Sequence, residues 1–294
     1  MANIKPEKPT SNFQPRRKPD WLKIKLPDLR YSDRVMNLLE HHCLNTICSS
    51  GMCPNRGECW NNGTATFMIG GDVCTRACKF CAVKTGNPHG VIDHGEVERI
   101  VDSVRKLNLQ HVVITSVDRD DLPDGGASHW AALLRKLRAD TPHVTVETLV
   151  PDFGGSEYAL GMVLEHRPEV VSHNLETVER LTPVVRSVAT FVRSLQVINR
   201  IASAGLKAKS GLMLGLGETP REVLQTMDKL LENGCSILTL GQYLQPTLRH
   251  FPVAEYITPG QFDRYREIGL QKGFRHVESG PFVRSSYHAE RHVH

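Results

Sequence analysis

The stretch HGEVERIVDSVRKLNLQHVVITSV (94–117) decides the fold class, because it sets a helix directly before a strand. Residues 94–108 carry apolar side chains at helical spacing, and residues 111–117 form a short apolar run typical of a buried strand. The same alternation recurs from Thr64 to Gly280. The further expected strands are 64–71, 143–151, 169–177, 206–217, 236–245 and 274–280, and the further expected helices are 127–140, 156–167, 191–204, 219–234 and 259–273.

Strand-helix alternation of this kind implies a parallel sheet with right-handed crossovers, and hence the α/β class. Polar and glycine-rich residues gather where the strands end, which is the edge that carries the site in such folds. We therefore expect residues 63–280 to form a partial (β/α)6 TIM-like barrel rather than a doubly wound open sheet. Residues 1–62 are expected to be an N-terminal extension that carries cysteines, and 281–294 a C-terminal tail that closes the site.

The N-terminal extension has little strand or helix pattern of its own. Residues 1–20 are polar and proline-rich, so we expect them to be extended. Residues 21–27 alternate apolar and basic side chains, which suits a short strand or strap, and 33–42 suit a short helix. The first cysteines then follow in an expected loop.

The bulk composition excludes several classes of protein. The 294 residues are 40% apolar and 23% charged, which is ordinary for a globular protein. A net charge of +4 is too weak to indicate a nucleic-acid partner. No apolar run approaches the roughly 18 residues of a membrane span, and the N-terminus lacks the apolar core of a secretory signal. We expect a cytoplasmic protein without a membrane partner, whose clustered thiols stay reduced.

Cysteines are the main functional signal, since seven of the eight fall between residues 43 and 81. Three of them stand in CTRACKFC as Cys74, Cys78 and Cys81. A structural zinc site needs four ligands. A cubane [4Fe–4S] cluster has four irons that each want one thiolate, so three thiolates leave one iron open to bind a small molecule. A zinc site completed by His89 or His94 is the alternative.

This C-x3-C-x2-C motif, placed just after the first expected strand, resembles that of the radical S-adenosylmethionine (SAM) enzymes, and Phe80 also fits their pattern. The resemblance implies a [4Fe–4S] cluster on Cys74, Cys78 and Cys81. Its open iron would chelate the amine and carboxylate of SAM. Electron transfer into the sulfonium would then cleave a C–S bond and yield a 5′-deoxyadenosyl radical.

A second group, Cys48, Cys53 and Cys59, stands in CSSGMCPNRGEC (48–59). Taken alone, it suits a zinc site completed by His41 or His42. Beside the first group, it suggests a second cluster. The stretch 46–81 closely resembles the lipoyl synthases. Further matching segments are RKPDWLKIKLP (17–27), TSVDRDDLPDGG (115–126), VETLVPDF (146–153), HNLETV (173–178), KSGLMLGLGE (209–218), LGQYLQP (240–246) and VESGPFVRSSYHA (277–289).

The family resemblance implies a sulfurtransferase that inserts two sulfur atoms at C6 and C8 of an octanoyl chain. The chain is amide-linked to a lysine of a lipoyl carrier domain, in a 2-oxoacid dehydrogenase E2 or a glycine cleavage H protein. Its unactivated C–H bonds have no acidic proton, so general base catalysis cannot open them, whereas a carbon radical can. The implied cofactors are two [4Fe–4S] clusters and SAM. The implied partners are the octanoylated carrier domain, an electron donor such as flavodoxin or ferredoxin, and an iron–sulfur carrier that rebuilds the second cluster after it gives up sulfur.

The RSSY segment (284–287) supplies the implied fourth ligand of the second cluster. Ser286 is the residue that the resemblance indicates, with Ser285 as the alternative. A serine oxygen is a harder and poorer ligand for cluster iron than a thiolate, so we expect it to leave readily. A serine pair that merely caps a turn is the structural alternative.

SAM needs groups for its adenine, ribose, ammonium and carboxylate. Acidic and amide side chains suit the ammonium and the ribose hydroxyls, and Lys209 could pair with the carboxylate. A purely structural role is the alternative for each candidate. The candidates at the expected strand ends are Thr115, Asp118, Glu147, Asn174, Glu176, Lys209, Leu212 and Gln242.

Residues outside these groups are expected to be structural. Cys43 and Cys235 belong to neither motif, and HAERHVH (288–294) is expected to fray. Two other functions stay open. One is a different two-cluster radical SAM enzyme, such as a biotin synthase or a methylthiotransferase, although the RSSY tail argues against it. The other is a non-catalytic metal-binding module, which iron and sulfide content and SAM cleavage would distinguish.

Overall fold

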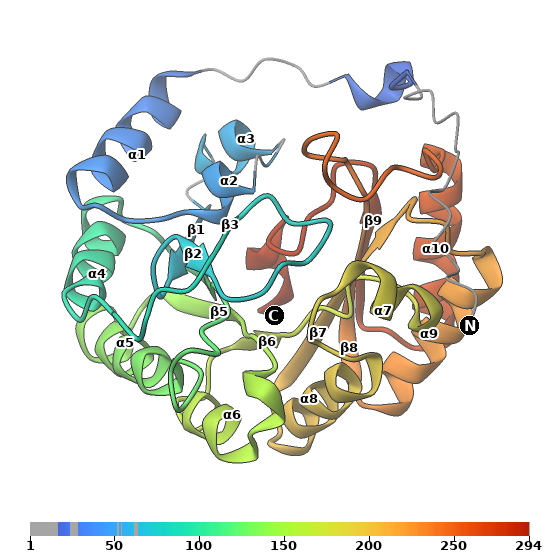
Figure 1. Ribbon diagram of the computed structural model, residues 1–294. Helices are drawn as coiled ribbons and strands as arrows, with labels where there is room; N and C mark the ends of the chain where they lie inside the picture. Colours follow the sequence, from blue (N-terminus) through green and yellow to red (C-terminus); the bar gives the residue numbers. More distant parts are fainter. Residues whose placement is uncertain (1–16, 24–28, 52, 54, 62–63, 294) are drawn as a thin grey trace, which may run out of the picture.

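Seven parallel strands in chain order form the sheet of the protein (Figure 1). The computed structural model describes residues 17–23, 29–51, 53, 55–61 and 64–293. The strands are β1 (Thr64–Ile69), β4 (His111–Ser116), β5 (Thr145–Leu149), β6 (Val170–Ser172), β7 (Lys207–Leu214), β8 (Cys235–Gln242) and β9 (His276–Gly280). The helices after Thr64 are α4 (Glu96–Lys106), α5 (Ala127–Asp140), α6 (Glu157–Leu164), α7 (Thr182–Val185), α8 (Phe191–Ser203), α9 (Pro220–Glu232) and α10 (Pro259–Lys272).

The strand order confirms the partial barrel. Each strand pairs in parallel with the next strand of the sheet in chain order, whereas a doubly wound sheet would reverse direction part-way. The helices ring the outside of the sheet (Figure 1). In the described part of the chain β9 does not pair with β1, so the barrel has an open seam between them. The expected strand 169–177 ends at Ser172, and Glu176 takes a left-handed φ of 68°.

The core lies between the sheet and the ring of helices. Val112 and Ile114 of β4 are fully buried, and Trp130 and Leu133 of α5 pack in the same core cluster. Burying such side chains stabilises a fold by roughly 1.5–3 kcal/mol each, which is the main term that holds helix to strand.

The cysteine-bearing extension is helical, which corrects the expected loop. It contains α1 (Leu29–His41), α2 (Ile47–Ser50) and α3 (Arg56–Asn61). Thr46 caps α2 by accepting from the Cys48 amide at 3.2 Å, and its hydroxyl donates to the Thr66 carbonyl of β1 at 2.7 Å. The expected strand at 21–27 begins instead as a 3₁₀ turn (Asp20–Leu22), and residues 24–27, like 1–16 of the expected extended segment, lie outside the described residues.

The C-terminal tail re-enters the barrel after β9. The amide of Asn55 donates to the Phe282 carbonyl at 2.6 Å, which ties the tail to the extension across the seam. The chain then forms a 3₁₀ turn, η4 (Ala289–His292), at the centre of the barrel (Figure 1). Ala289 and His292 are fully buried, so the expectation of a frayed end was wrong. Among the described residues, no helix has the length and apolar character needed to cross a membrane.

Candidate functional site

The loop that carries Cys74, Cys78 and Cys81, which we call the barrel trio, follows β1 and is fastened to three neighbouring loops. Its short strand β2 (Val73–Cys74) pairs with β3 (Lys84–Thr85). The Thr75 amide donates to the Asp118 carbonyl at 3.0 Å, and the Lys79 amide donates to the Val185 carbonyl at 2.8 Å. His250 Nε2 lies 3.0 Å from the Cys81 carbonyl. These contacts of the loop backbone hold it against its neighbours without using the three thiols.

The thiols of the barrel trio influence one another. Burial raises the pKa of Cys81 to about 12, and the neighbouring Cys78 and Cys74 add to the increase. Burial likewise raises the pKa of Cys74 to about 11, with a contribution from the Asp118 carboxylate. Cys78 Sγ lies 3.9 Å from Ser187 Oγ. Three thiols on one loop are the residue type that holds a [4Fe–4S] cluster, and binding of a cluster there would displace their protons.

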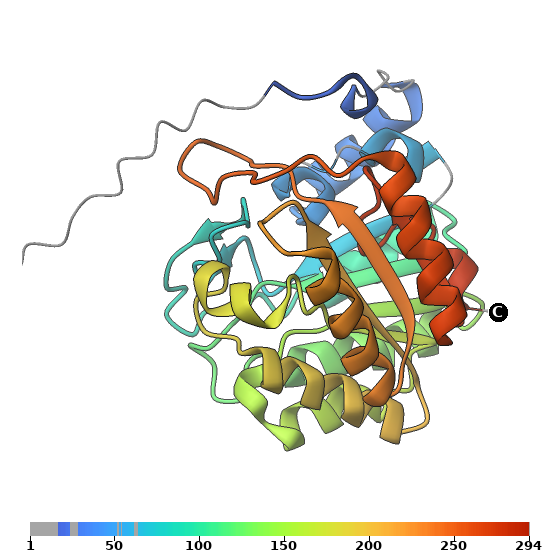
Figure 2. The same ribbon diagram turned by 90° about the vertical axis from the view of Figure 1, so that its right-hand side faces the viewer.

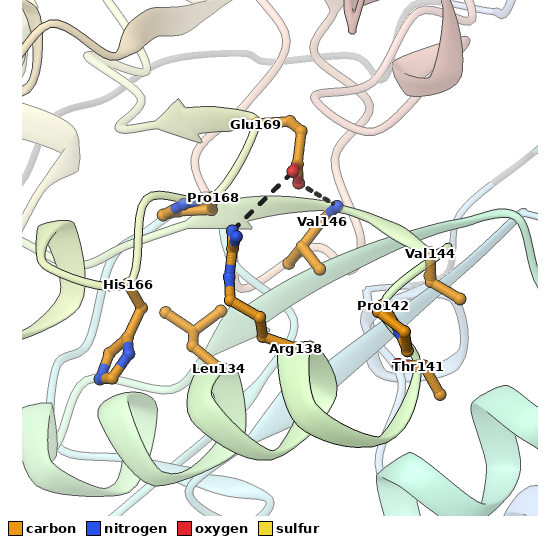
Figure 3. Close-up of a pocket in the computed structure, with 9 residues that line it drawn as sticks. All are labelled: Leu134, Arg138, Thr141, Pro142, Val144, Val146, His166, Pro168 and Glu169. Atoms are coloured by element: carbon orange, nitrogen blue, oxygen red, sulfur yellow. Dashed lines mark hydrogen bonds and ion pairs between the residues drawn. The ribbon is translucent and has the colours of Figure 1, made fainter.

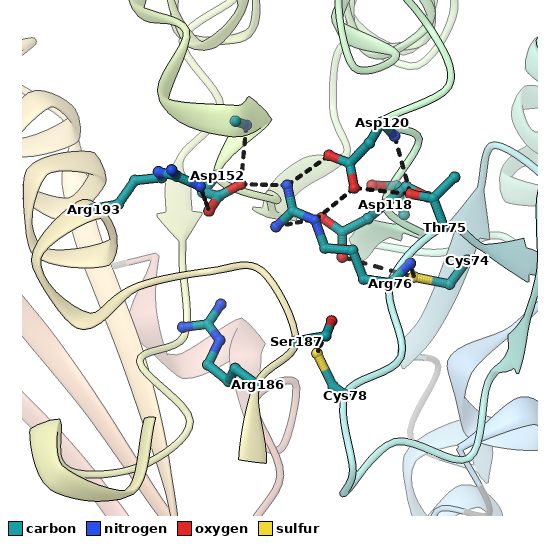
Figure 4. A network of polar contacts seen from close by, with 12 residues as sticks. Cys74, Thr75, Arg76, Cys78, Asp118, Asp120, Asp152, Arg186, Ser187 and Arg193 are labelled. Atoms are coloured by element: carbon teal, nitrogen blue, oxygen red, sulfur yellow. Dashed lines mark hydrogen bonds and ion pairs between the residues drawn. The ribbon is translucent and has the colours of Figure 1, made fainter. Parts of the chain in front are cut away.

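Arg76, inside the same loop, is the centre of a buried charge network (Figure 4). Its guanidinium donates to both oxygens of Asp120 at 2.8 and 2.7 Å. It also lies 3.2 Å from Asp118 Oδ1 and 2.7 Å from Asp152 Oδ1. Arg193 reaches Asp152 Oδ2 at 3.3 Å. The network joins the loop to the segments that follow β4 and β5. Sequence reasoning missed Arg76, because an arginine inside a cysteine loop carries no signal of its distant carboxylates.

Cys48, Cys53 and Cys59, which we call the auxiliary trio, lie on and between α2 and α3. Burial raises the pKa of Cys59 to about 12, and Cys53 and Cys48 add to the increase. The three thiols thus influence one another, as those of the barrel trio do, and three thiolates are the residue type that a second cluster would need.

The RSSY segment of the tail lies against the auxiliary trio. Tyr287 Oη donates to Glu58 Oε1 at 3.1 Å, beside Cys59 in α3. Burial lowers the pKa of Arg284, and the nearby Cys53 thiol opposes that effect. Ser286 is half-buried between Arg284 and Tyr287. Residues more than 200 positions apart in the sequence thus meet at the open seam of the barrel.

Three of the expected SAM contacts lie with the barrel trio. Asp118 approaches Cys74 Sγ at 3.8 Å. Burial raises the pKa of Glu176, Arg186 opposes the increase, and Asn174 hydrogen-bonds the same carboxylate. Glu176 in turn adds to the raised pKa of Cys81. Arg186 was not expected from the sequence.

Two buried polar atoms here lack a partner among the described residues, namely Nε of Arg186 and Oδ1 of Asn174. Nη1 of Arg186 lies within 3.4 Å of the carbonyls of Asn174 and Leu175 and within 2.9 Å of Ser194 Oγ, so the guanidinium is fixed in place. Buried polar groups are normally paired. The site thus offers a fixed guanidinium, an unpaired amide oxygen and a neighbouring carboxylate. These groups suit a zwitterionic ligand such as the amino-acid end of SAM.

Glu147 and Lys209 lie elsewhere, in the interior of the barrel. Lys209 Nζ donates to both oxygens of Glu147, at 2.7 and 3.0 Å, and both side chains are about 1% exposed. Ser172 donates to the same carboxylate at 3.0 Å. Lys209 is the third residue of β7 rather than its end, and its charge is neutralised by Glu147. We therefore treat this pair as part of the interior.

The remaining expected contacts are engaged within the protein. Thr115 Oγ1 donates to the Leu149 carbonyl at 3.2 Å. Leu212 is buried and forms a backbone bridge with Glu176. The amide of Gln242 donates to the carbonyls of Leu214, Tyr243 and Glu255, each at 3.0 Å, and its oxygen accepts from the Ile257 amide at 2.8 Å.

Two of the four histidines named as zinc alternatives have other partners. His42 Nδ1 lies 2.8 Å from Ser103 Oγ of α4, and the His94 ring packs against the His129 ring. Across the described residues, no three His, Cys, Asp or Glu side chains converge as the ligands of one metal ion do.

A small surface pocket lies at the opposite end of the strands from the cysteines (Figure 3). It is lined by the end of α5, the start of β5 and the segment before β6, where Glu169 accepts from the Val146 amide at 2.7 Å. Active sites in parallel barrels lie at the carboxyl ends of the strands, so this pocket is separate from the candidate site.

Comparison with known proteins decides the family. Residues 68–230 match the model of the radical SAM superfamily. A lipoyl synthase from Bacteroides thetaiotaomicron is 57% identical over 278 residues, which cover 94% of this chain and 98% of that protein. A lipoyl synthase from Treponema denticola is 58% identical over 277 residues, 94% of this chain and 95% of that protein. The chain belongs to the lipoyl synthase family of radical SAM enzymes.

The extent of these matches fits the geometry. The radical SAM match includes the barrel trio and ends in α9, whereas a lipoyl synthase match over 278 of 294 residues spans both trios. Membership makes the protein an enzyme that uses SAM and a [4Fe–4S] cluster.

Solved structures share the fold at low identity. Streptococcus suis SuiB bound to S-adenosylmethionine is 12% identical with a TM-score of 0.57 and covers 83% of this chain and 52% of that chain. Methylornithine synthase (PylB) is 12% identical with a TM-score of 0.56, and the match covers 84% of this chain and 81% of that chain.

Proposed function

We propose that this lipoyl synthase family member inserts two sulfur atoms, at C6 and C8, into an octanoyl chain held in amide linkage on a lysine of a lipoyl carrier domain. The barrel trio would hold the [4Fe–4S] cluster that works with SAM. The auxiliary trio, with Ser286 as fourth ligand, would hold a second [4Fe–4S] cluster. Bound together, these groups supply hydrogen-atom abstraction from unactivated C–H bonds and a source of sulfur.

The observation that carries the proposal is the meeting of the RSSY segment with the auxiliary trio. Three thiols alone leave a cubane one ligand short, and the contact between Tyr287 and Glu58 holds a serine-bearing turn next to Cys59. A radical SAM enzyme that needed only its SAM cluster would have no use for this arrangement. The tail therefore supports a second cluster with a serine ligand, which is what the proposed sulfur insertion needs.

Arg186, Glu176 and Asn174 are our candidates for the amino-acid end of SAM. The guanidinium of Arg186 suits the carboxylate, and the carboxylate of Glu176 suits the ammonium. Arg186 takes the role that the sequence suggested for Lys209, which is neutralised by Glu147. Asp118, beside Cys74, stays a candidate for the ribose hydroxyls.

The Arg76 network fixes the geometry of the reaction site. Arg76 binds the cluster loop to three carboxylates from two strand ends, which fixes the loop relative to Arg186 and Glu176. Radical chemistry between two bound molecules needs positional precision of this kind. Gln242 performs a similar task on the other side, since its saturated amide fixes the segment after β8.

The partners follow from the chemistry. The substrate is an octanoylated carrier domain, from an E2 or an H protein. A one-electron donor such as flavodoxin or ferredoxin supplies electrons, and an iron–sulfur carrier rebuilds the auxiliary cluster. Cys48, Cys59 and the barrel trio form no disulfide, which suits the reducing cytoplasm.

The test is an anaerobic assay with reconstituted protein, reductant, SAM and an octanoyl-lysyl peptide. Mass spectrometry follows 5′-deoxyadenosine and peptide mass together. We expect both 5′-deoxyadenosine and a peptide that has gained two sulfur atoms.

Two variants make the assay specific. Replacing the auxiliary trio by alanine should leave 5′-deoxyadenosine formation and remove sulfur insertion, whereas replacing the barrel trio should remove both. A wild-type protein that forms 5′-deoxyadenosine and leaves the peptide unchanged would exclude this substrate and retain only the radical SAM assignment.

A further inference from the structure

Ala289 and His292 of the last turn, η4, are buried at the amino-terminal end of the barrel. Beyond β9 the tail crosses the seam and turns back, and Figure 2 shows the C-terminus at the opposite end of the barrel from β2 and β3. The end of this segment, η4, contacts β4, and His292 is 0% exposed. Among the described residues Nε2 of His292 has no hydrogen-bond partner, so Nδ1 is the ring nitrogen through which the side chain is held.

Two lysines of β7 hold the end of the tail. Lys209 Nζ lies 3.2 Å from His292 Nδ1, and Lys207 Nζ donates to the carbonyls of His292 at 3.4 Å and Val293 at 2.5 Å. An ammonium has only donors, so Nδ1 must be the acceptor and the imidazole is neutral with its proton on Nε2. Lys209 is itself held by its ion pair with Glu147, so the ammonium that contacts His292 has a fixed position.

The same tail is held at its other end near the auxiliary trio. Asn55 binds the Phe282 carbonyl. A Cβ on Gly241 of β8 would stand 2.1 Å from the Val283 carbonyl oxygen, so the tail passes β8 in direct contact with its backbone. Ser286 thus lies between an upstream contact at residues 282–283 and a downstream contact at His292.

We infer that His292 is a positioning residue for Ser286, holding the tail so that the serine oxygen stays over the auxiliary trio. The inference rests on the proposed role of Ser286 as a cluster ligand. A single oxygen ligand binds cluster iron weakly, so its occupancy depends on how tightly its chain is confined. Removing the His292 side chain takes away one anchor of the tail and leaves the contact of Tyr287 with Glu58 and the contacts of Lys207 with the backbone. The serine is then held less closely over the cluster, which loses iron more easily.

The experiment measures iron loss from the auxiliary site alone. In full-length protein whose barrel trio is replaced by alanine, the auxiliary cluster is reconstituted and its iron loss to an excess of chelator is followed anaerobically.

We expect H292A to lose iron about tenfold faster, in line with a lost hydrogen bond to a charged donor. H292N, whose amide oxygen can occupy the place of Nδ1, should lose iron at close to the rate of the parent protein. H292Q, whose oxygen reaches further, should resemble H292A. R291A, which removes a neighbouring side chain that is 62% exposed, is the matched control and should have no effect.

A second readout separates positioning from general stability. With the barrel trio intact, H292A should still form 5′-deoxyadenosine from SAM at the wild-type rate, because the barrel site does not depend on the tail. If H292A does not fold, the comparison of H292N with H292Q decides.

The outcomes distinguish the inference from the function on which it rests. Unchanged iron loss in S286A removes the ligand role of Ser286 and the inference with it. Faster iron loss in S286A would support the ligand role of Ser286. If H292A then loses iron at the parent rate, or if H292N and H292Q lose iron at equal rates, the inference about His292 is wrong and the role of Ser286 still stands.

Discussion

Arg76 Nη2 lies 2.7 Å from Asp152 Oδ1, which links the cysteine loop after β1 to the segment after β5. Both side chains are buried, Asp152 completely. Burial alone would raise the pKa of Asp152, but Arg76 reverses the effect and lowers it to about 2. Removing Arg76 would leave the buried Asp152 carboxylate with only Arg193, at 3.3 Å, to compensate its charge.

Removal of Arg76 should therefore cost more than removal of the pair. R76A should lower the free energy of unfolding by about 3–5 kcal/mol and reduce iron at the barrel trio. The double variant R76A/D152N should recover part of that loss, because the buried carboxylate has been neutralised. Chemical denaturation and iron content of the anaerobic proteins measure both effects. If the double variant loses as much free energy of unfolding as R76A and D152N together, the contact between Arg76 and Asp152 carries no coupling energy.

Arg186 should matter for SAM rather than for the cluster. R186Q should raise the KM for SAM by about tenfold to a hundredfold, as expected for the loss of a hydrogen bond to a charged group, with iron content unchanged. R180Q is the control, because Arg180 makes an exposed ion pair with Glu222. Steady-state formation of 5′-deoxyadenosine gives the KM values. A wild-type KM in R186Q would remove Arg186 from the SAM site.

Gly241 should be needed for the auxiliary cluster, although it lies in a strand far along the chain from those cysteines. The Cβ of G241A would collide with the Val283 carbonyl and displace the tail. We predict loss of auxiliary iron and of sulfur insertion, with 5′-deoxyadenosine formation retained. G260A is the matched control, since a Cβ on Gly260 meets nothing within 4 Å and alanine favours the helix. Retention of full sulfur insertion in G241A would contradict the tail path.

Three buried histidines should make the fold sensitive to acid. Burial lowers the pKa of His111 and His173 to about 4 and that of His292 to about 2. Their folded pKa values lie below the unfolded value of about 6.5, so the unfolded state binds more protons and stability falls as the pH falls through that value. Between pH 7.5 and 6.0 each histidine should cost about 0.8 kcal/mol.

The variant H292N tests this account, because it removes one of the three titrating groups. Chemical denaturation measures the free energy of unfolding of wild type and H292N at the two pH values. Between pH 7.5 and 6.0 this free energy should fall by about 0.8 kcal/mol less in H292N than in wild type. An identical pH dependence in both proteins would mean that His292 does not titrate on unfolding.

The barrel and its trio could be read from the sequence because each signal is local. Apolar runs alternate with helical periods, and Cys74, Cys78 and Cys81 stand within eight residues. Contacts that depend on distant partners could not be read this way. Arg76 and Arg186 acquire their roles from carboxylates and carbonyls that the fold brings to them.

Two features depend on the polar interior of the barrel, which the sequence does not reveal. Lys209 and Glu147 look like site residues because buried strands rarely carry charges, yet they neutralise each other inside the barrel. The polar C-terminus looks like a solvated end, but it docks onto that same pair through His292. Neither partner reveals the other in the sequence.

The most direct test of the central claim follows the origin of the inserted sulfur. Protein whose clusters have been rebuilt with heavy-isotope sulfide is given SAM, reductant and octanoyl-lysyl peptide for a single turnover in buffer without sulfide. The account predicts a product peptide that contains two heavy sulfur atoms, and no such product when the auxiliary trio is replaced by alanine. A product that contains only light sulfur, or heavy sulfur without the auxiliary trio, would contradict it.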